Sequence, residues 1–139
     1  MIAGRWAWLL LAALAVPAGV AAQESLAAVA ENARRALQQG NLVGLLRSGD
    51  RILLQLPNVQ PSTAVGAAQA EATLRALLGR NDDHEVSLAS HREIERGRGY
   101  VELQRVTRHR AGGAPRVQTI LLGYRRAERG WMLVEVRVF

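Results

Sequence analysis

RVQTILLGYRRAERGWMLVEVRVF, residues 116–139, contains two runs of apolar and β-branched residues joined by a short polar connection. The composition predicts a strand over 116–126, a tight connection at 128–130 and a last strand over 131–139. Strict alternation divides the last strand into Met132, Val134, Val136 and Val138 on one face and Trp131, Leu133, Glu135 and Arg137 on the other. Both strands are therefore apolar on two faces, which is typical of strands that are covered on both sides.

The preceding segment extends this pattern towards the N-terminus. HEVSLASHREI, residues 84–94, alternates in the manner of a strand, and GRG at 97–99 is typical of a turn. YVELQRVTRHR, residues 100–110, then predicts a partner strand, and AGGAP at 111–115 predicts a second turn. The second half of the chain is thus expected to be an antiparallel meander.

The first half contains the helical patterns. Apolar residues at spacings of three and four predict an amphipathic helix over 24–39. A helical turn over 42–47, a strand over 50–56 and a helix over 64–81 follow, with a proline-containing loop before the last helix. The order helix, helix, strand, helix and strand meander predicts an α+β fold in which helices pack on one face of a curved antiparallel sheet.

The N-terminal residues have the layout of a secretory signal peptide. Arg5 precedes an apolar run from Trp6 to Val16, and small residues lead up to Ala22. This predicts a signal peptide over 1–22 and a single domain over 23–139, exported to the periplasm or secreted, with no membrane span after cleavage. Retention of the leader as an anchor is the alternative. The chain contains no Cys, so no disulfide supports the fold.

The chain is basic, with a net charge of +6, and every basic residue apart from the histidines is an arginine. A surface that follows nucleic-acid phosphates needs a one-sided basic stripe with few acids in it. The stretch around Tyr100 instead divides its arginines between two strand faces and two turns, and mixes them with Glu93, Glu95 and Glu102. A nucleic-acid partner is therefore not expected.

The layout resembles the ketosteroid-isomerase-like superfamily, also called nuclear-transport-factor-2-like. The segments that carry the resemblance are the QQGN end of the first helix, GAAQAEATLRALL at 66–78, and the terminal GWMLVEVRV. The chain is similar, more narrowly, to a group of small exported bacterial proteins of unknown function. The resemblance implies a cone-shaped sheet wrapped around helices, a pocket inside the cone, and dimerisation through the sheet in many members. It does not imply catalysis, because such folds serve enzymes and binding proteins alike.

Residues that could perform acid–base chemistry are few. Asp50, His91, Tyr100 and Tyr124 are the candidates for an isomerase- or dehydratase-type site, which needs a base and a group that stabilises an enolate. Turn preferences favour a structural role for Asp50, and the two tyrosines fit positions at a rim or interface. His84 and its acidic neighbours lack the spacing of a metal site. The sequence indicates no cofactor and no metal.

Three functional hypotheses follow. The first is an exported noncatalytic binding or interaction module, dimeric through its sheet, which holds a small apolar ligand in the cone or binds an envelope protein. The second is a small isomerase- or dehydratase-type enzyme with an acid or base inside the cone. The third is electrostatic adhesion to anionic envelope surfaces, which requires Arg92, Arg96, Arg98, Arg108 and Arg110 to gather on one side. The sequence favours a noncatalytic protein over an enzyme.

Overall fold

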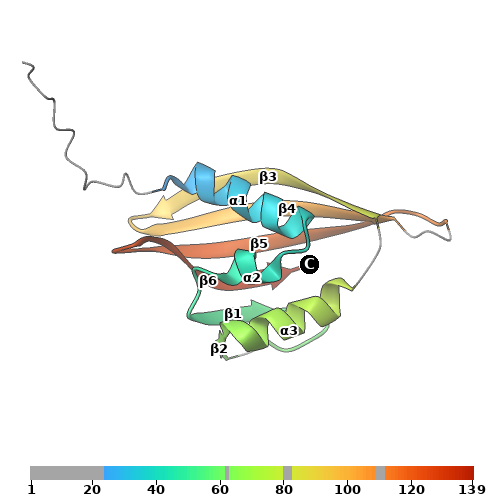
Figure 1. Ribbon diagram of the computed structural model, residues 1–139, viewed down its shortest axis with the longest axis horizontal. Helices are drawn as coiled ribbons and strands as arrows, with labels where there is room; N and C mark the ends of the chain where they lie inside the picture. The colour runs from blue at the N-terminus through green and yellow to red at the C-terminus, as the bar shows by residue number, and fades with distance from the viewer. Residues whose placement is uncertain (1–23, 62, 80–82, 109–111) are drawn as a thin grey trace, which may run out of the picture.

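The computed structural model describes residues 24–61, 63–79, 83–108 and 112–139 (Figure 1). The predicted signal peptide lies outside these residues. The described elements, in chain order, are α1 (Leu26–Gln38), α2 (Leu42–Leu46), β1 (Arg51–Gln55), β2 (Val65–Gly66), α3 (Ala67–Leu78), β3 (Asp83–Glu95), β4 (Arg98–Arg108), β5 (Arg116–Ala127) and β6 (Gly130–Val138). This order confirms the predicted α+β class and the predicted succession of helices and strands. No helix among the described residues is both long and apolar enough to cross a membrane.

The six strands form one sheet in the order β2-β1-β6-β5-β4-β3. Strands β3 to β6 make the predicted antiparallel meander. The prediction of an antiparallel sheet throughout was wrong, because β1 pairs with β6 in parallel, with Leu53 opposite Glu135. The chain between these two strands is long, since it includes α3 and the strands β3 to β5, and this length allows the parallel pairing. The two-residue strand β2, which the sequence did not indicate, pairs with β1.

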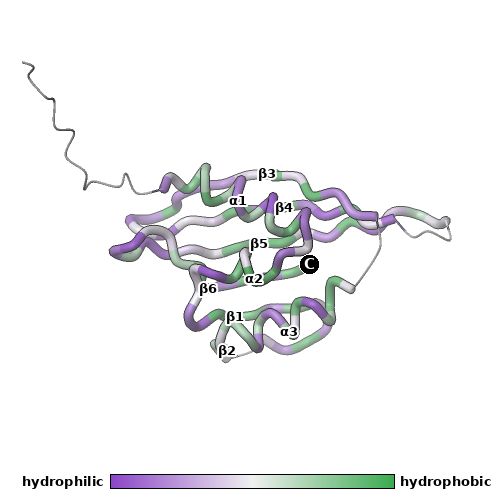
Figure 2. Tube along the Cα trace, in the orientation of Figure 1, coloured by the Kyte–Doolittle hydropathy of each residue, from purple (hydrophilic) through white to green (hydrophobic). Residues whose placement is uncertain are grey.

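All three helices lie on the same face of the sheet, which we call the concave face (Figure 1). Helix α1 packs on β3 and β4, whereas α3 packs on β1 and β2. Figure 2 shows hydrophobic stretches in β1, β5 and α2, the elements around the middle of this layer. The core between helices and sheet includes residues that are almost wholly buried: Leu46, Ile52, Leu74, Leu103, Ile120, Leu122, Leu133 and Val136.

Helix α1 is fixed at both ends by side-chain hydrogen bonds. Ser25 caps its N-terminus, where the hydroxyl accepts a hydrogen bond from the Ala28 N–H at 3.2 Å. At its last residue, the Gln38 amide donates to the His84 carbonyl at 2.9 Å and accepts from the Val86 N–H at 2.7 Å. Gln38 thus bonds to β3 as a neighbouring strand would, and holds the helix against the edge of the sheet.

Strand β6 contains an extra residue that breaks the predicted alternation. Gly123 of β5 lies opposite Glu135, but Tyr124 lies opposite Leu133, so Val134 forms a β-bulge. Trp131 and Leu133 are consequently buried on the same face as Val136 and Val138. The prediction of one face for Met132, Val134, Val136 and Val138 was therefore wrong for Met132 and Val134, because alternation restarts at the bulge.

One arginine of the meander is part of the core. Arg105 faces the helices, as its predicted phase with Val101 and Leu103 requires, and it is only 6% exposed. Its guanidinium donates to the Gln118 side chain at 3.0 Å and to the Leu78 carbonyl, at the C-terminal end of α3, at 3.2 Å. The hydrogen bonds to that carbonyl and to the neighbouring strand make its burial tolerable and tie α3 to the sheet.

Replacing Val136 with Asp should unfold the protein. Val136 is 1% exposed, and an unpaired buried carboxylate costs several kcal/mol, comparable with the about 5–15 kcal/mol by which such domains are stable. Val117→Asp, a matched substitution at a residue that is 58% exposed on β5, should lower the free energy of unfolding by less than about 1 kcal/mol. Urea denaturation followed by circular dichroism measures both; a folded Val136→Asp variant would contradict this assignment of faces.

Candidate functional site

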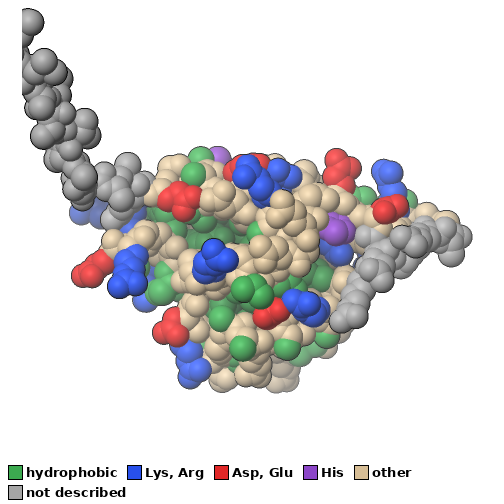
Figure 3. Space-filling view, viewed as in Figure 1, with side chains coloured by type: hydrophobic (Ala, Val, Ile, Leu, Met, Phe, Trp, Pro, Cys, Tyr) green, Lys and Arg blue, Asp and Glu red, His purple; other side chains and the backbone are tan. Residues whose placement is uncertain are grey.

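A cavity of about 470 Å³ lies between α1, α2 and the adjoining part of the sheet, and it is open to solvent on one side. Figure 3 views the molecule from the helical side, where apolar side chains are visible between the helices. The cavity is lined by side chains from α1, α2, the connection after α2, β5 and β6: Glu24, Val29, Asn32, Ala33, Arg35, Ala36, Gln39, Asn41, Leu45, Arg47, Ser48, Tyr124 and Trp131. The lining thus combines apolar and aromatic side chains with polar and charged ones.

The sheet supplies the floor of this cavity through Tyr124 and Trp131. Tyr124 follows Ile120 and Leu122 in the inward-facing phase of β5. Trp131 faces inward because of the bulge at Val134. Strand β1 pairs with β6 only at Glu135 to Arg137. Closer to the start of β6, the Ser48 hydroxyl accepts a hydrogen bond from the Leu133 N–H at 3.2 Å. This bond fixes the segment after α2 next to the strand that carries Trp131.

Trp131 is packed on two sides. One of its neighbours is Gly99 of β4, which has no Cβ atom. If residue 99 had one, it would lie 3.4 Å from the Trp131 Cζ3 and 2.8 Å from the end of the Leu26 side chain. A larger residue at position 99 would force the Leu26 side chain to move. The Arg126 guanidinium lies over the ring at 4.8 Å from its centre, within the range of a cation–π contact. The indole is thereby held in one orientation.

The indole N–H of Trp131 has no hydrogen-bond partner among the described residues, although it is buried. Buried tryptophans usually pair this group, since an indole nitrogen is a donor only and loses its water on burial. The indole N–H is therefore a buried donor beside the cavity, without an acceptor among the described residues.

Tyr124 is 4% exposed, and among the described residues its hydroxyl is not one of the buried side-chain atoms without a hydrogen-bond partner. Burial raises the pKa of Tyr124 well above the ordinary tyrosine value, and the negative charge of Glu24 raises it further. The hydroxyl is consequently protonated throughout the physiological pH range. It can act as a donor to a ligand but not as a base.

The rim carries charges of both signs. The Glu24 carboxylate accepts a hydrogen bond from the Asn32 amide at 2.5 Å and is exposed. Arg35 lies 3.8 Å from Glu31, on the outer side of α1. Arg47, at the end of α2, has no acidic partner among the described residues. The rim thus combines one carboxylate with two guanidinium groups, neither of which is held deep in the cavity.

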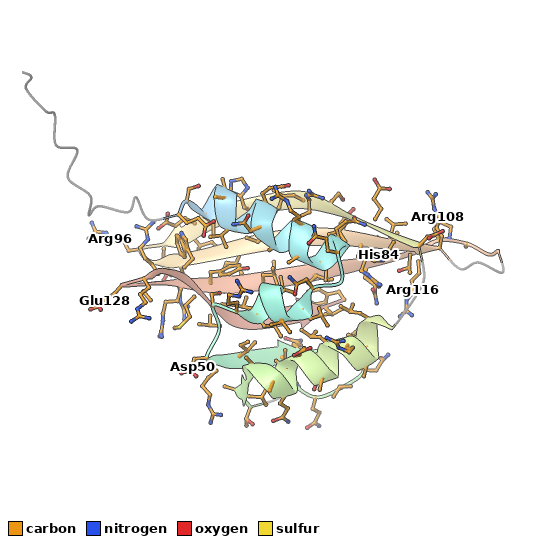
Figure 4. The ribbon with its side chains drawn as sticks, viewed as in Figure 1. Asp50, His84, Arg96, Arg108, Arg116 and Glu128 are labelled. Carbon is orange, nitrogen blue, oxygen red and sulfur yellow. The ribbon has the colours of Figure 1, made fainter. Side chains whose placement is uncertain are left out.

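The structure brings Tyr124 alone, of the four predicted candidates, to this cavity. Asp50 is exposed in the connection before β1 and points away from the helices (Figure 4). His91 is exposed on the edge strand β3. Tyr100 lies on the opposite face of the sheet, with its Cε1 atom 3.4 Å from the position of a Cβ at Gly123. Tyr124 is also inside the cone and not at the rim or interface that its sequence neighbours suggested.

Sequence analysis did not identify Trp131, Asn32, Arg35, Arg47 or Glu24 as site residues. The phase of Tyr124 with Ile120 and Leu122 was a usable signal that it faces inward. Trp131 had no such signal, since strict alternation placed it on the wrong face. The rim residues lie on helix positions whose sequence pattern shows only that they are polar.

The described residues contain no group of three or more His, Asp or Glu side chains that could hold a metal ion. His84, the centre of the acidic cluster in the sequence, instead bonds through its ring Nε2 to the Gln38 carbonyl at 2.8 Å. His84 lies where α1 contacts the edge strand β3, and it does not line the cavity (Figure 4).

No family model and no curated protein matches this sequence. Solved structures are similar in fold. A ketosteroid-isomerase-like protein from Erwinia carotovora atroseptica is 13% identical, with a TM-score of 0.63 over 81% of this chain and 91% of its own. A calcium/calmodulin-dependent protein kinase type II association domain from Thiobacillus denitrificans is 17% identical, with a TM-score of 0.63 over 84% and 94%. A DUF4783 family protein from Bacteroides uniformis is 21% identical, with a TM-score of 0.61 over 78% and 93%.

These similarities confirm the fold that the resemblance implied. The exported group within the superfamily stays a prediction, because identities this low establish fold alone. The chain has the curved-sheet cone of the ketosteroid-isomerase-like, or nuclear-transport-factor-2-like, proteins.

Proposed function

We propose that this protein is a noncatalytic binding module that holds a small, largely apolar ligand in the cavity between α1, α2 and the sheet. The observation that carries the proposal is the cavity itself, whose about 470 Å³ matches sites for small organic molecules, about 300–1,000 Å³. Apolar side chains from both helices and two aromatic residues of the sheet line it, and polar side chains surround its opening.

An isomerase- or dehydratase-type activity has weaker support. Such a reaction needs a base within hydrogen-bonding reach of the substrate carbon, commonly a buried carboxylate or a histidine. Asp50 and His91 are remote from the cavity, and no histidine of the described residues lines it. Glu24 is at the exposed rim, and Tyr124 retains its proton.

Electrostatic adhesion to anionic surfaces also has weaker support. The hypothesis requires Arg92, Arg96, Arg98, Arg108 and Arg110 to gather on one side. Arg110 lies outside the described residues. Arg96 and Arg108 instead lie at opposite ends of the sheet (Figure 4). Arg98 and Arg108 are the first and last residues of β4, and at a rise of about 3.3 Å per residue they are about 33 Å apart.

The place of action follows from the predicted leader. An exported chain would meet its ligand or its protein partner in the periplasm or outside the cell. A ligand taken up there can be recovered with the protein from its own envelope.

Replacing Ala36 with Phe should fill the cavity and displace the ligand. Ala36 lines the cavity from α1, where a phenyl group can enter empty space without displacing the core. Native mass spectrometry of protein purified from its own envelope should show a bound small molecule in the wild type and none in Ala36→Phe. Ala27→Phe, at an exposed position on the same helix, should keep the molecule. A wild type that is empty when isolated in this way would argue against the binding role.

We further propose that two copies associate through the outer face of the sheet, the face that none of the described helices covers (Figure 1). Half-buried apolar side chains interrupt the polar residues of this face: Leu53, Val106, Leu121, Met132 and Val134. Glu135 and Arg137 pair with each other beside them, so their charges are partly neutralised. Such a face is suited to a second copy, which would cover these apolar side chains.

Light scattering at micromolar concentration should give the mass of a dimer. Leu121→Arg places a charge at the centre of the outer face, between Glu102 of β4 and Arg137 of β6, and should give a monomer. Val43→Arg, at a residue 54% exposed on the helical side, should leave the mass unchanged. A monomeric wild type removes the dimer proposal and leaves the cavity proposal untouched.

A further inference from the structure

The turn between β3 and β4 and the turn between β5 and β6 lie at the same end of the sheet, as Figure 4 shows for Arg96 and Glu128. The Arg126 N–H donates to the Gly97 carbonyl at 2.7 Å, which joins the two hairpins where their turns begin. Residues 95–98 and 125–130 together contain five arginines and two glutamates. This end of the molecule therefore carries an excess of positive charge.

Two of these arginines, Arg98 and Arg125, lie directly opposite each other on β4 and β5. Antiparallel pairs alternate between those whose backbone groups bond to each other and those whose backbone groups do not. The bond from Arg126 to Gly97 places the neighbouring pair, Arg98 and Arg125, in the second class, in which the Cα atoms are only about 4.5 Å apart. Arg98 is in phase with Tyr100, so both arginine side chains lie on the outer face.

No carboxylate among the described residues neutralises this arginine pair. Both side chains are exposed, and neither forms an ion pair within the described part of the chain. On the two sides of the pair, Glu95 lies opposite Arg98 without an ion pair, and Met132 lies opposite Arg125. Like charges directly opposite each other on a sheet are destabilising, so the free protein carries a repulsion here.

A doubly charged oxyanion would turn this repulsion into attraction. A guanidinium group donates two parallel hydrogen bonds to one oxyanion, so the two oxygens of a carboxylate are used by a single arginine. A phosphate monoester has three terminal oxygens and close to two negative charges, and it can accept from two guanidinium groups at once. Arg96, Arg126 and Arg129 add to the positive potential around the pair.

We propose that Arg98 and Arg125 together bind a phosphate monoester group, carried either by a soluble compound or by a lipid headgroup. Neither arginine lines the cavity, so this site does not depend on the proposed binding function. Arg125 is four residues from Leu121, about 13 Å along β5, and thus lies toward the margin of the proposed dimer contact.

The first test is thermal unfolding, at low ionic strength and pH 7.5, of protein purified from its own envelope. In chloride, Arg125→Gln should raise the Tm by about 2 °C, because the repulsion between the two arginines is gone. In phosphate of the same ionic strength, the wild type should gain more than the variant, so that this difference disappears.

A matched variant controls for the general effect of phosphate, which stabilises folded proteins because it is excluded from their surfaces. Arg116 is an exposed arginine of the same strand, opposite Thr107 and at the other end of the sheet (Figure 4). Arg116→Gln should have the Tm of the wild type in chloride and the same gain in phosphate.

Binding is measured with glycerol 3-phosphate, by the shifts of backbone amide signals of β4 and β5 in nuclear magnetic resonance spectra. Wild type and Arg116→Gln should bind equally, whereas Arg98→Gln and Arg125→Gln should each bind about tenfold more weakly, since each loses one charge-assisted contact. Acetate should bind the wild type more weakly than glycerol 3-phosphate does.

Sedimentation with vesicles of phosphatidylcholine and phosphatidic acid distinguishes the two sources of the phosphate group. Sedimentation of the wild type that is lost in Arg125→Gln assigns a lipid headgroup. Binding of glycerol 3-phosphate without sedimentation assigns a soluble phosphate ester.

Three results would overturn the inference. The first is an Arg125→Gln variant that is no more stable than the wild type in chloride, because the repulsion is then absent. The second is a loss of binding in Arg116→Gln as large as that in Arg125→Gln, or equal binding of acetate. The third is failure of both glycerol 3-phosphate and the vesicles to bind the wild type.

Discussion

The extra residue in β6 is the constraint on which the rest of the site depends. A strand that alternates without interruption can present either Trp131 and Leu133 or Val136 and Val138 to the helices, but not both pairs. The bulge at Val134 lets all four face inward. The C-terminal part of β6 therefore packs in the core, and Trp131, near its N-terminal end, lines the cavity. Trp131 is thereby buried, and its indole N–H has no hydrogen-bond acceptor among the described residues.

Local periodicity predicted the elements well. The helix over 24–39 and the meander over the second half follow directly from spacings of three and four and from alternation, and the structure has them with small shifts at the ends. The pairing of strands that are distant in the sequence was harder to predict. The parallel contact of β1 with β6 and the two-residue β2 leave no local pattern, because they depend on how the chain returns after α3.

The site was less predictable than the fold. Acid–base candidates were chosen by residue type, and residue type cannot show that Asp50 points outward or that Tyr100 lies behind the sheet. Arg105 illustrates the same limit in the opposite direction. Its phase predicted a position facing the helices, but only the structure shows that Gln118 and the end of α3 supply the hydrogen bonds that make a buried guanidinium tolerable.

The bond between Gln38 and β3 has a consequence for the behaviour of this protein at high concentration. An edge strand with unpaired backbone groups can recruit strands from other molecules and start fibrous growth. Here one amide side chain occupies the backbone positions at His84 and Val86, and the charged residues Arg92, Glu93 and Glu95 follow on the same strand. The side chain of a helix thus opposes the addition of a further strand at the N-terminal part of β3, and like-protein contacts there would first have to displace it.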